Sequence, residues 1–461
     1  MNHRLATIIS TLFIVLLLGV MAAVGLGEEW NVQASSPIYV RKDGDDTICD
    51  GHHDAPATSA PDCAFASISR GLTVVDSGGV VIVAAGIYSA PLNVTKELTL
   101  QGAGVGSTIV DGGGTARVLS VNPNGAADVS NITLRNGHST YGGGIHNMGA
   151  LTLTRSAVFS NAVSFSGGGI FNANGATMVI SDCIVSDNRS EEKGAGIFNF
   201  NSALTVVRST MMSNIAALHG GGLESVGGTL TVDGSTIRKN RALGDYAVGG
   251  GLFNDSEATL SRVTIAENTS NDRGGGLFNQ GPMTLTNVTI SGNAAGGQGG
   301  GVLHSGAFTL TVVNCTVANN SILTGSGAGG IHLASPAFVE NTLLADNDNG
   351  NCDIVDDNLI SKGHNLDSGD TCDLSAAGDI AGTASLIGPL ADNGGPSTGL
   401  EEATLTQALL GGSPAIDAGV CVPGVATDQR GVARPQGDDC DIGAYEFTGY
   451  HVFLPLVQRS Q

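Results

Sequence analysis

The sequence is poor in charge, in aromatic side chains and in basic residues. Charged residues make up 13% of the 461 residues, aromatic residues 4%, and there is a single Trp. The scarcity of Glu and Lys excludes a coiled coil or long-helix protein. Acidic residues outnumber basic ones by 42 to 20, and the net charge of −22 excludes the basic field that nucleic-acid binding requires. Hydrophobic residues, at 41%, are numerous enough for a core, which argues against disorder.

Glycine, by contrast, is abundant. The 69 glycines are about 15% of the chain, twice the usual share of roughly 7%. They show no period of three, which excludes collagen. Instead, GGGIHN begins at Gly142, GGGIFN at Gly167, and six further variants follow at intervals of 25–29 residues. A period of this length indicates a solenoid or a propeller, and the lack of helix-forming sequence favours strands.

A second element with alternating hydrophobicity lies between these strings and ends at an Asn. LTLTRSAVFSN ends at Asn161 and LTVVRSTMMSN at Asn214, with apolar residues three and eight places before each Asn. Alternation with a period of two predicts strands with one buried face. Because so short a unit cannot enclose its own core, the units stack in register, roughly 4.8 Å apart.

The expected fold class is therefore all-β. We predict a right-handed parallel β-helix solenoid of the pectate-lyase type, with three short strands in each coil of 25–29 residues. A propeller is disfavoured because it needs longer units with four strands each.

Asparagines recur at two positions of the unit, one after the glycines and one at the end of the second element. Stacking brings equivalent amides onto neighbouring coils, where they can hydrogen-bond along the axis, as in cross-β assemblies. We interpret them as structural ladders and not as catalytic residues. The first ladder comprises Asn147, Asn172, Asn199, Asn254 and Asn279, and the second comprises Asn161, Asn188, Asn214, Asn240, Asn268, Asn293, Asn320 and Asn347.

Six of the eight cysteines form pairs that are close in sequence and lie outside the repeat: Cys49 and Cys63, Cys352 and Cys372, Cys421 and Cys440. Export permits disulfides, and no CxxC or His-x3-5-His spacing favours a metal site, although sequence does not fix connectivity. Cys183 and Cys315 share one column five coils apart, about 24 Å, whereas a disulfide needs Cα atoms within about 7 Å. Both are predicted to be free, buried thiols.

The ends of the chain differ from the repeat. Residues 1–27 combine a short basic start with an apolar run, which predicts a signal peptide or, alternatively, an uncleaved anchor. An N-terminal capping segment is expected over 28–78, and within it 64–75 is predicted to form an amphipathic helix that covers the end of the barrel. The remaining segments are the β-helix over 79–390, a C-terminal capping segment over 391–447 and an apolar tail over 448–461.

Two parts of the chain resemble known families. The units from GGGIHN to VFSN, clearest at 142–161, resemble the repeat of polymorphic outer-membrane proteins over roughly residues 130–350. The C-terminal strings resemble a choice-of-anchor Q domain; they are SKGHNL at Ser361, PLADNGGPST at Pro389, GGSPAIDAG at Gly411 and TDQRGVARPQGDDCDIGAYEF at Thr427. This second resemblance implies an exported bacterial β-helix protein attached to the envelope, and it supplies no catalytic residues.

β-Helices include many polysaccharide lyases and hydrolases, and in such enzymes the catalytic residues project from the outward face. A lyase needs a Lys or Arg base beside calcium-binding carboxylates, and a hydrolase needs two or three carboxylates on one face. The weak candidates within the repeat are His219 and Glu224. The column that contains Glu224 is interpreted as packing, with a sugar-binding stripe as the alternative; its other members are His146, Phe171, Phe198, Phe253, Phe278, Leu303 and His332.

Acidic loops form the other candidate sites. Carboxylate clusters outside cells can bind calcium, but these have neither the calcium-binding nonapeptide nor EF-hand spacing. We interpret them as solvated loops, with calcium binding as the alternative. They contain Asp43, Asp45 and Asp46, then Asp346, Asp348, Asp353, Asp356 and Asp357, and finally Asp438, Asp439 and Asp441.

The sequence therefore favours a secreted or surface-associated bacterial β-helix with a structural, adhesive or matrix-binding role, and with no catalysis and no cofactor. Its expected partners are extracellular polysaccharide, the cell envelope or a surface protein. Nucleic acid is not expected, and membrane contact is expected only through an uncleaved N-terminus or C-terminal sorting. The alternative is a carbohydrate-active enzyme, a polysaccharide lyase or glycoside hydrolase. Three carboxylates in a groove, or an Arg or Lys near two, would favour that alternative.

Overall fold

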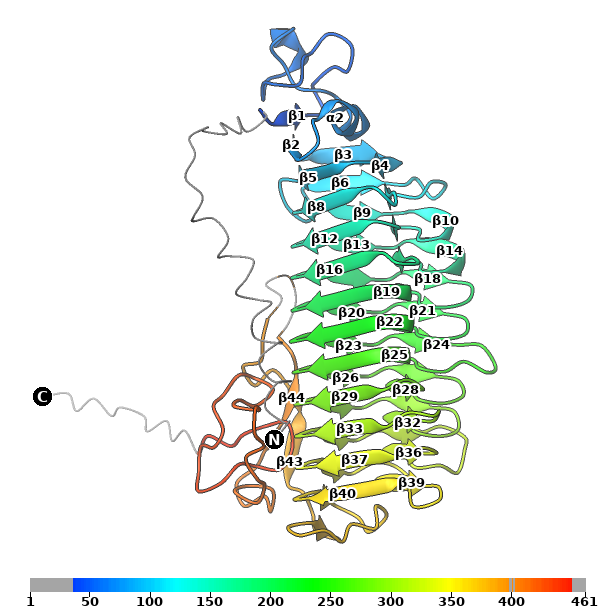
Figure 1. Cartoon of the computed structure of the whole chain (residues 1–461), viewed down its shortest axis with the longest axis vertical. Coiled ribbons are helices and arrows are strands. Elements are labelled where there is room, and N and C mark those ends of the chain that lie inside the picture. Colours follow the sequence, from blue (N-terminus) through cyan, green and yellow to red (C-terminus); the bar gives the residue numbers. More distant parts are fainter. Residues whose placement is uncertain (1–35, 398–399, 401–402, 450–461) are drawn as a thin grey trace, which may run out of the picture. The chain divides into compact units, whose positions relative to one another are not determined.

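A computed structural model of the chain describes residues 36–397, 400 and 403–449. The expected signal segment and most of the expected tail lie outside these residues. In the described part, short strands stack in parallel register on successive coils, forming a parallel β-helix (Figure 1). The described residues include no helix that is both long enough and apolar enough to span a bilayer.

The largest sheet has 21 strands. It contains both the strand after the glycines and the strand of the second element, which merge into one strand in three coils. Its strands are β1 (Ile38–Val40), β2 (Gly79–Val83), β4 (Leu92–Val94), β5 (Glu97–Gln101), β7 (Leu119–Val121), β8 (Ala126–Ser130), β11 (Ile145–Asn147), β12 (Ala150–Thr154), β15 (Ile170–Asn172), β16 (Thr177–Ser181), β19 (Ile197–Val207), β22 (Leu223–Asp233), β25 (Leu252–Ser261), β28 (Leu277–Asn279), β29 (Met283–Thr286), β32 (Val302–His304), β33 (Leu310–Val313), β36 (Ile331–Leu333), β37 (Ala337–Glu340), β39 (Cys352–Ile354) and β40 (Leu359–Gly363).

The second sheet has 13 strands and contains the segments that run toward the second-ladder Asn. Its strands are β3 (Gly86–Ser89), β6 (Thr108–Asp111), β9 (Thr133–Arg135), β13 (Ala157–Phe159), β17 (Ile184–Ser186), β20 (Thr210–Met212), β23 (Thr236–Arg238), β26 (Thr264–Ala266), β30 (Thr289–Ser291), β34 (Thr316–Ala318), β38 (Leu343–Ala345), β41 (Leu366–Asp367) and β42 (Ile380–Ala381).

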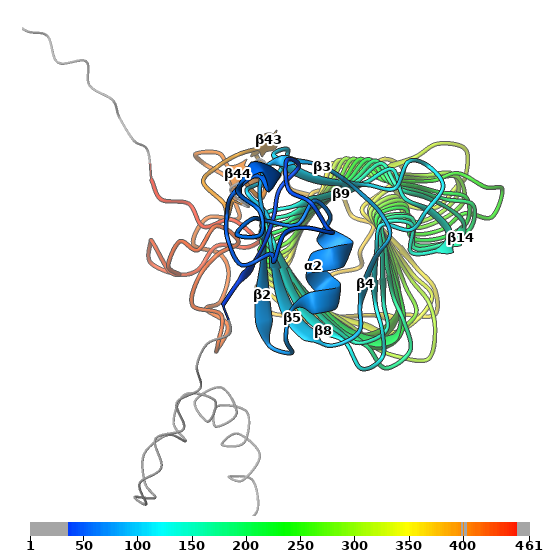
Figure 2. The ribbon, with the colours of Figure 1, turned by 90° about the horizontal axis from the view of Figure 1, so that it is seen from above.

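A third sheet of eight short strands follows the second-ladder Asn, where the sequence predicted no strand. Strands of two residues carry too little alternation to be recognised. Figure 2, which looks down the coils, shows this sheet standing out beside the barrel at β14. Its strands are β10 (His138–Tyr141), β14 (Ala162–Ser166), β18 (Arg189–Ser190), β21 (Ile215–Ala216), β24 (Arg241–Ala242), β27 (Thr269–Ser270), β31 (Ala294–Ala295) and β35 (Ser321–Ile322).

Inside the coils, equivalent residues stack as the repeat predicted. Ile145 pairs in register with Ile170, and Ile170 with Ile197. All three side chains are fully buried. A buried aliphatic side chain contributes about 1.5–3 kcal/mol, so every coil adds a similar increment through its columns.

Both asparagine ladders are present in the structure. Asn161 donates through its side-chain amide to Oδ1 of Asn188 at 3.0 Å, and Asn188 donates in the same way to Asn214. The other amide hydrogen of Asn161 reaches the Leu134 carbonyl at 3.2 Å. In the first ladder, Asn199 donates to the Ser225 hydroxyl at 3.0 Å, because Ser225 replaces the ladder Asn in the next coil. The ladders therefore satisfy buried polar groups at the turns.

The triple-glycine corner folds each coil sharply. Gly194 has a φ of +54°, and a Cβ atom there would lie 2.7 Å from Cβ of Phe198. Only glycine permits both this conformation and this close approach. This bend brings two positions of the repeat together. One is the residue that precedes the glycines, and the other is the residue that follows the buried Ile or Leu after those glycines.

The N-terminal end is closed by α2 (Ile68–Val74), which lies across the barrel in Figure 2. The Ser67 hydroxyl caps this helix, which is shorter than the predicted 64–75, and its Leu72 faces the core. A short 3-10 helix, η1 (Ala57–Ser59), precedes it. Because Ile38 of β1 pairs with Val81 of β2, the first coil begins inside the expected capping segment.

The C-terminal segment packs along the side of the coils, not over their end as its designation as a cap suggested (Figure 1). It contains the antiparallel pair β43 (Ile387–Ala391) and β44 (Thr406–Leu409). The Gln429 side chain accepts a hydrogen bond from Thr289 at 2.6 Å and donates one to Thr264 at 3.0 Å. Outward Thr hydroxyls on the 13-stranded sheet thus supply the docking contacts, which a single-sequence pattern does not reveal.

A buried ion pair organises the C-terminal motif. Nη1 of Arg434 lies 2.7 Å from a carboxylate oxygen of Glu446, and both side chains are 1% exposed. Arg434 also donates to the carbonyls of Asp441 and Gly443. Burial raises the pKa of Asp441 to about 6. These residues of the family-like motif therefore have a structural role in this chain.

Disulfides join the three cysteine pairs that are close in sequence: Cys49–Cys63, Cys352–Cys372 and Cys421–Cys440, with Cα–Cα distances of 4.9, 4.9 and 5.1 Å. Cys183 and Cys315 are free and buried, as predicted. Burial raises the pKa of each thiol to about 12.

Candidate functional site

A cavity of about 450 Å³ lies at the corner between the eight-stranded sheet and the start of the 21-stranded sheet. Five aromatic side chains dominate its lining, with one carboxylate and one amine among the polar groups. The lining residues are Tyr141, Phe165, Ser166, Phe171, Asn174, Glu192, Lys193, Phe198 and Phe200. An apolar hollow with a few polar groups is the usual character of a small-molecule site.

Two columns of the repeat build this cavity. Tyr141, Ser166 and Lys193 each precede the first glycine of a corner and pair in register from coil to coil. Phe171 and Phe198 follow the glycines and pair in the same way. The glycine corner turns the first column against the second, so one short sequence segment contributes both walls.

The aromatic rings contact one another along the coils. The Tyr141 ring stacks on Phe171 at a centroid distance of 5.2 Å, and Phe171 stacks on Phe198 at 5.4 Å. Phe165 meets Tyr141 edge-on at 5.0 Å, and Phe200 lies 5.7 Å from Phe198. Phe165 is 39% exposed, so the surface is not wholly closed by its own packing. The column of Phe171 and Phe198, which the sequence predicted to be packing, therefore also forms one wall of the cavity.

Glu224 takes the place of an aromatic residue in the coil after Phe198. It pairs in register with Phe198 on one side and Phe253 on the other, and it is fully buried. Within the described part of the chain, neither carboxyl oxygen accepts a hydrogen bond of good geometry, although the Gly194 backbone N–H is close enough to favour the charged form. Burial raises its pKa to about 8, the Glu192 charge adds to this rise, and Lys193 opposes it. The Glu224 carboxyl is therefore protonated at neutral pH.

His219 lies beside Glu224 at the glycine corner of the same coil. Its ring stacks on Phe253 at 5.3 Å, and its Nδ1 is buried without a partner among the described residues. Burial lowers its pKa to about 4, and the charge of Lys193 acts in the same direction. His146, three coils earlier, also has a pKa of about 4 because of burial and the nearby Arg117. Both imidazoles are neutral at pH 7.

The structure thus places the two sequence candidates on one coil, each in register with a residue that lines the aromatic cavity: Lys193 for His219 and Phe198 for Glu224. Sequence reasoning missed Tyr141, Phe165, Glu192, Lys193 and Phe200. Tabulating the residue before each glycine triplet would have found Tyr141, Lys193 and His219 as one column. The charges of Lys193 and Glu192 both act on Glu224, so a Lys stands near two carboxylates, the arrangement that would favour an enzyme.

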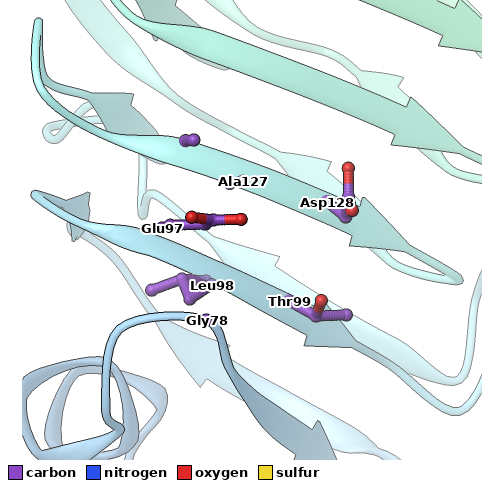
Figure 3. A pocket seen from close by; sticks show the side chains of 7 residues that line it. Gly78, Glu97, Leu98, Thr99, Ala127 and Asp128 are labelled. Carbon is purple, nitrogen blue, oxygen red and sulfur yellow. The ribbon is translucent and has the colours of Figure 1, made fainter. Parts of the chain in front are cut away.

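A second, smaller hollow of about 120 Å³ lies near the N-terminal end (Figure 3). Glu97 and Thr99 of β5 and Asp128 of β8 line it, and both carboxylates are exposed. It lacks aromatic side chains and is polar and open. Its character is therefore that of a surface depression between coils.

Metal-ligating side chains also meet in the N-terminal cap. Ligand atoms of Asp50, His53 and Asp62 lie within 4.8 Å of one another, and all three residues are exposed. In the acidic loops, several carboxylates have partners within the protein: Asp43 pairs with Arg41 at 2.9 Å, and Asp353 lies 2.7 Å from His332. The interpretation of these loops as solvated, with calcium binding as the alternative, stays a prediction.

Comparison with known proteins agrees with this architecture. A family model described as a right handed beta helix region matches residues 205–365. The chain therefore has the right-handed parallel β-helix fold. No curated protein matches this β-helix protein in sequence.

Two solved structures share the fold. One is the crystal structure of pectate lyase Pel9A, with 16% identity and a TM-score of 0.52, covering 89% of this chain and 96% of that one. The other is the complex structure of XylC with xylose, with 9% identity and a TM-score of 0.54, covering 88% and 98%. At such low identity these likenesses establish the β-helix fold alone.

Proposed function

We propose that this β-helix is an exported, surface-associated bacterial protein that binds extracellular carbohydrate in the aromatic cavity without cleaving it. The observation that carries the proposal is the set of five aromatic side chains around a cavity of about 450 Å³. Aromatic rings offer flat, rigid apolar faces, which suit the C–H faces of sugar rings, while nearby polar groups bind hydroxyls. Three disulfides are consistent with an oxidising compartment outside the cytoplasm.

The lining chemistry favours binding over cleavage. Glu192 is the one carboxylate in the described lining, whereas hydrolysis requires two carboxyl groups at opposite sides of the scissile bond. Glu224 is nearby but closed to solvent. Attachment to the envelope, which the C-terminal resemblance implies, would make this protein a surface adhesin or matrix binder.

The test is binding of the exported, disulfide-bonded chain to an array of plant, bacterial and animal polysaccharides. We expect binding to at least one glycan, and at least a tenfold loss in the Phe171→Ala/Phe200→Ala double variant. Phe159→Ala is the matched control because this Phe is 39% exposed and lies outside the cavity lining. An array without binding, or a double variant that binds like the parent and retains its melting temperature, would overturn the proposal.

The second candidate is a carbohydrate-active enzyme, and the position of Lys193 near Glu192 and Glu224 favours it. A protonated carboxyl at neutral pH is the general acid that glycosidases use. Incubation of each bound glycan with the protein, with and without calcium, should give no new reducing ends and no unsaturated products. Turnover that disappears in both Glu192→Gln and Glu224→Gln would replace the binding proposal with this enzyme.

A further inference from the structure

Unpartnered polar atoms gather around the aromatic cavity. Among the described residues, Nδ1 of His146, Oγ of Ser166, Nδ1 of His219 and both carboxyl oxygens of Glu224 are buried without a hydrogen-bond partner. Ser166 itself lines the cavity. Buried polar groups in native proteins are nearly always satisfied, because an unpaired one is unfavourable. His146, His219 and Glu224 do not line the cavity, but each pairs in register with a lining residue: Phe171, Lys193 and Phe198, respectively. The five atoms beside this cavity therefore point to a partner that the chain does not itself supply.

These groups are spread along the axis of the coils. His146 pairs in register with Phe171, Phe171 with Phe198, and Phe198 with Glu224. His146 and Glu224 are thus three coils apart, which corresponds to roughly 14 Å at the strand spacing. Aromatic faces occupy the two coils between them. This column is therefore aromatic in the middle and polar at both ends, while Ser166 and Lys193 add polar groups beside the two aromatic coils.

We propose that this groove holds a linear, uncharged oligosaccharide of about three sugar rings that lies along the coil axis, with its hydroxyls bound by His146 and Ser166 at one end and by His219 and Glu224 at the other. The inference rests on the proposed carbohydrate-binding function and names its ligand. A hydroxyl both donates and accepts, so it can pair with a neutral imidazole, a Ser hydroxyl and a carboxylic acid. One sugar unit advances by about one coil spacing, so each ring meets one coil.

Access to the buried polar end requires a side chain to move. Lys193 lines the cavity, and its charge acts on both His219 and Glu224, so its flexible four-carbon side chain stands beside them. The oligosaccharide displaces this side chain toward solvent when it binds. Phe198 and Phe253, which flank Glu224, are rigid rings and keep their places.

The site is uncharged at both ends over a defined pH range. His146 and His219 have pKa values of about 4, and Glu224 has a pKa of about 8. The charged groups that act on Glu224 are Lys193 and Glu192, while its coil neighbours Phe198 and Phe253 carry no charge. Affinity should therefore be constant from pH 5 to 7. It should fall near pH 9, where ionised Glu224 can no longer donate and attracts Lys193.

The experiment is calorimetric titration of the exported chain with cello- and xylo-oligosaccharides of one to six rings. We expect affinity to rise at least tenfold from one ring to three and to change less than twofold beyond four. Glu224→Leu should weaken binding of the three-ring ligand about tenfold at pH 6, whereas Glu224→Gln keeps a neutral donor and acceptor and should remove the fall between pH 7 and 9. Glu257→Gln is the matched control, because Glu257 is exposed on the next coil.

A second variant keeps the proposal testable if the Glu224 variants fail to fold. His146→Phe retains a ring in the stack but removes the imidazole nitrogens, so it should weaken the three-ring ligand and leave the one-ring ligand unchanged. Affinity that is independent of chain length, or Glu224→Leu binding like the parent, would overturn the axial arrangement. If the protein binds a glycan on the array but neither the cello- nor the xylo-oligosaccharides, only the proposal of a linear, uncharged ligand is overturned. An array without any binding would overturn the carbohydrate function as well.

Discussion

The same groove is open in one half of the β-helix and closed in the other. Up to the coil of Lys193, it widens into the aromatic cavity. After the coil of Glu224, Val248, Phe253, Phe278 and Leu303 pack into a small apolar cluster of their own. Fold, register and glycine corner are the same in both halves. Side chains at two positions of each coil therefore decide whether the groove can receive a ligand.

The residue before the glycines accounts for much of this difference. In the open half the position is occupied by Tyr141, the short Ser166 and the long Lys193. In the closed half, Val248 is 4% exposed and packs against Phe253, and the next residue of the column, Arg273, lies over the Phe278 ring at 6.0 Å. The boundary coil carries His219 and Glu224, whose buried polar groups lower stability without packing in compensation. Buried polar groups that lower stability in this way are expected where function, and not folding, constrains the residue.

The largest expected effect tests the closed half. Phe253→Ala should reduce the free energy of unfolding by about 3 kcal/mol, because it opens a cavity in a buried cluster. Phe171→Ala in the open half should reduce it by about 1 kcal/mol, since its ring is partly exposed. Urea denaturation of the two variants measures this difference. Equal losses would show that the open groove is as tightly packed as the closed one.

The next effect concerns how stability depends on pH through Glu224, in the coil between the open and closed halves. Because the folded-state pKa of Glu224 is about 8, above its ordinary 4.5, the folded protein holds this proton more tightly than the unfolded chain. Stability is therefore undiminished below pH 4.5 and falls by a few kcal/mol as the pH rises to 8. Glu224→Gln should melt several degrees higher than the parent at pH 8 and equally at pH 4. A parent and variant with parallel pH profiles would contradict the buried neutral acid.

Glu224→Phe sharpens the same comparison. This change would place an aromatic side chain between Phe198 and Phe253 and should stabilise the protein by about 1–3 kcal/mol at pH 7, provided that the coil accommodates the larger ring. Thermal unfolding measures the gain. It should also abolish the loss of saccharide affinity near pH 9 together with part of the binding itself. A destabilised variant would mean that the coil at Glu224 is too narrow for a ring.

The last comparison concerns the two free thiols, for which we expect no difference between the halves. Cys183 lies inside the open half and Cys315 inside the closed half, both fully buried with pKa values of about 12. A thiol reagent should modify neither in the native protein at pH 8 and both after unfolding. Mass spectrometry after timed alkylation measures this. Faster reaction of Cys183 would indicate that the open groove loosens the core behind it.

Much of the fold was predictable because stacking repeats one environment in every coil. The apolar columns and both ladders follow from residue identity at a fixed position, as with Ile145, Ile170 and Ile197. The eight-stranded sheet was not predictable, since six of its eight strands have only two residues and carry no readable alternation. The side-on docking of the C-terminal segment was equally hidden, because the contact of Gln429 with Thr289 joins residues 140 positions apart.

For the candidate site, the sequence indicated His219 and Glu224 as unusual members of their columns. It could not show that Glu224 is fully buried, and so it could not show that its carboxyl is neutral at pH 7. The aromatic cavity was also out of reach. Phe165 and Phe200 stand outside the repeating strings, and their contribution depends on where the coil bends.

The amino-acid sequence by itself determined the period, the parallel stacking and the buried columns, because each depends on which residue recurs at which interval. The tertiary structure alone decided that two outward columns converge at the glycine corner. That convergence depends on the backbone angles of Gly194 and its equivalents, which bring side chains from either side of the bend into contact. Whether the resulting corner is filled or hollow is then a matter of side-chain volume, coil by coil.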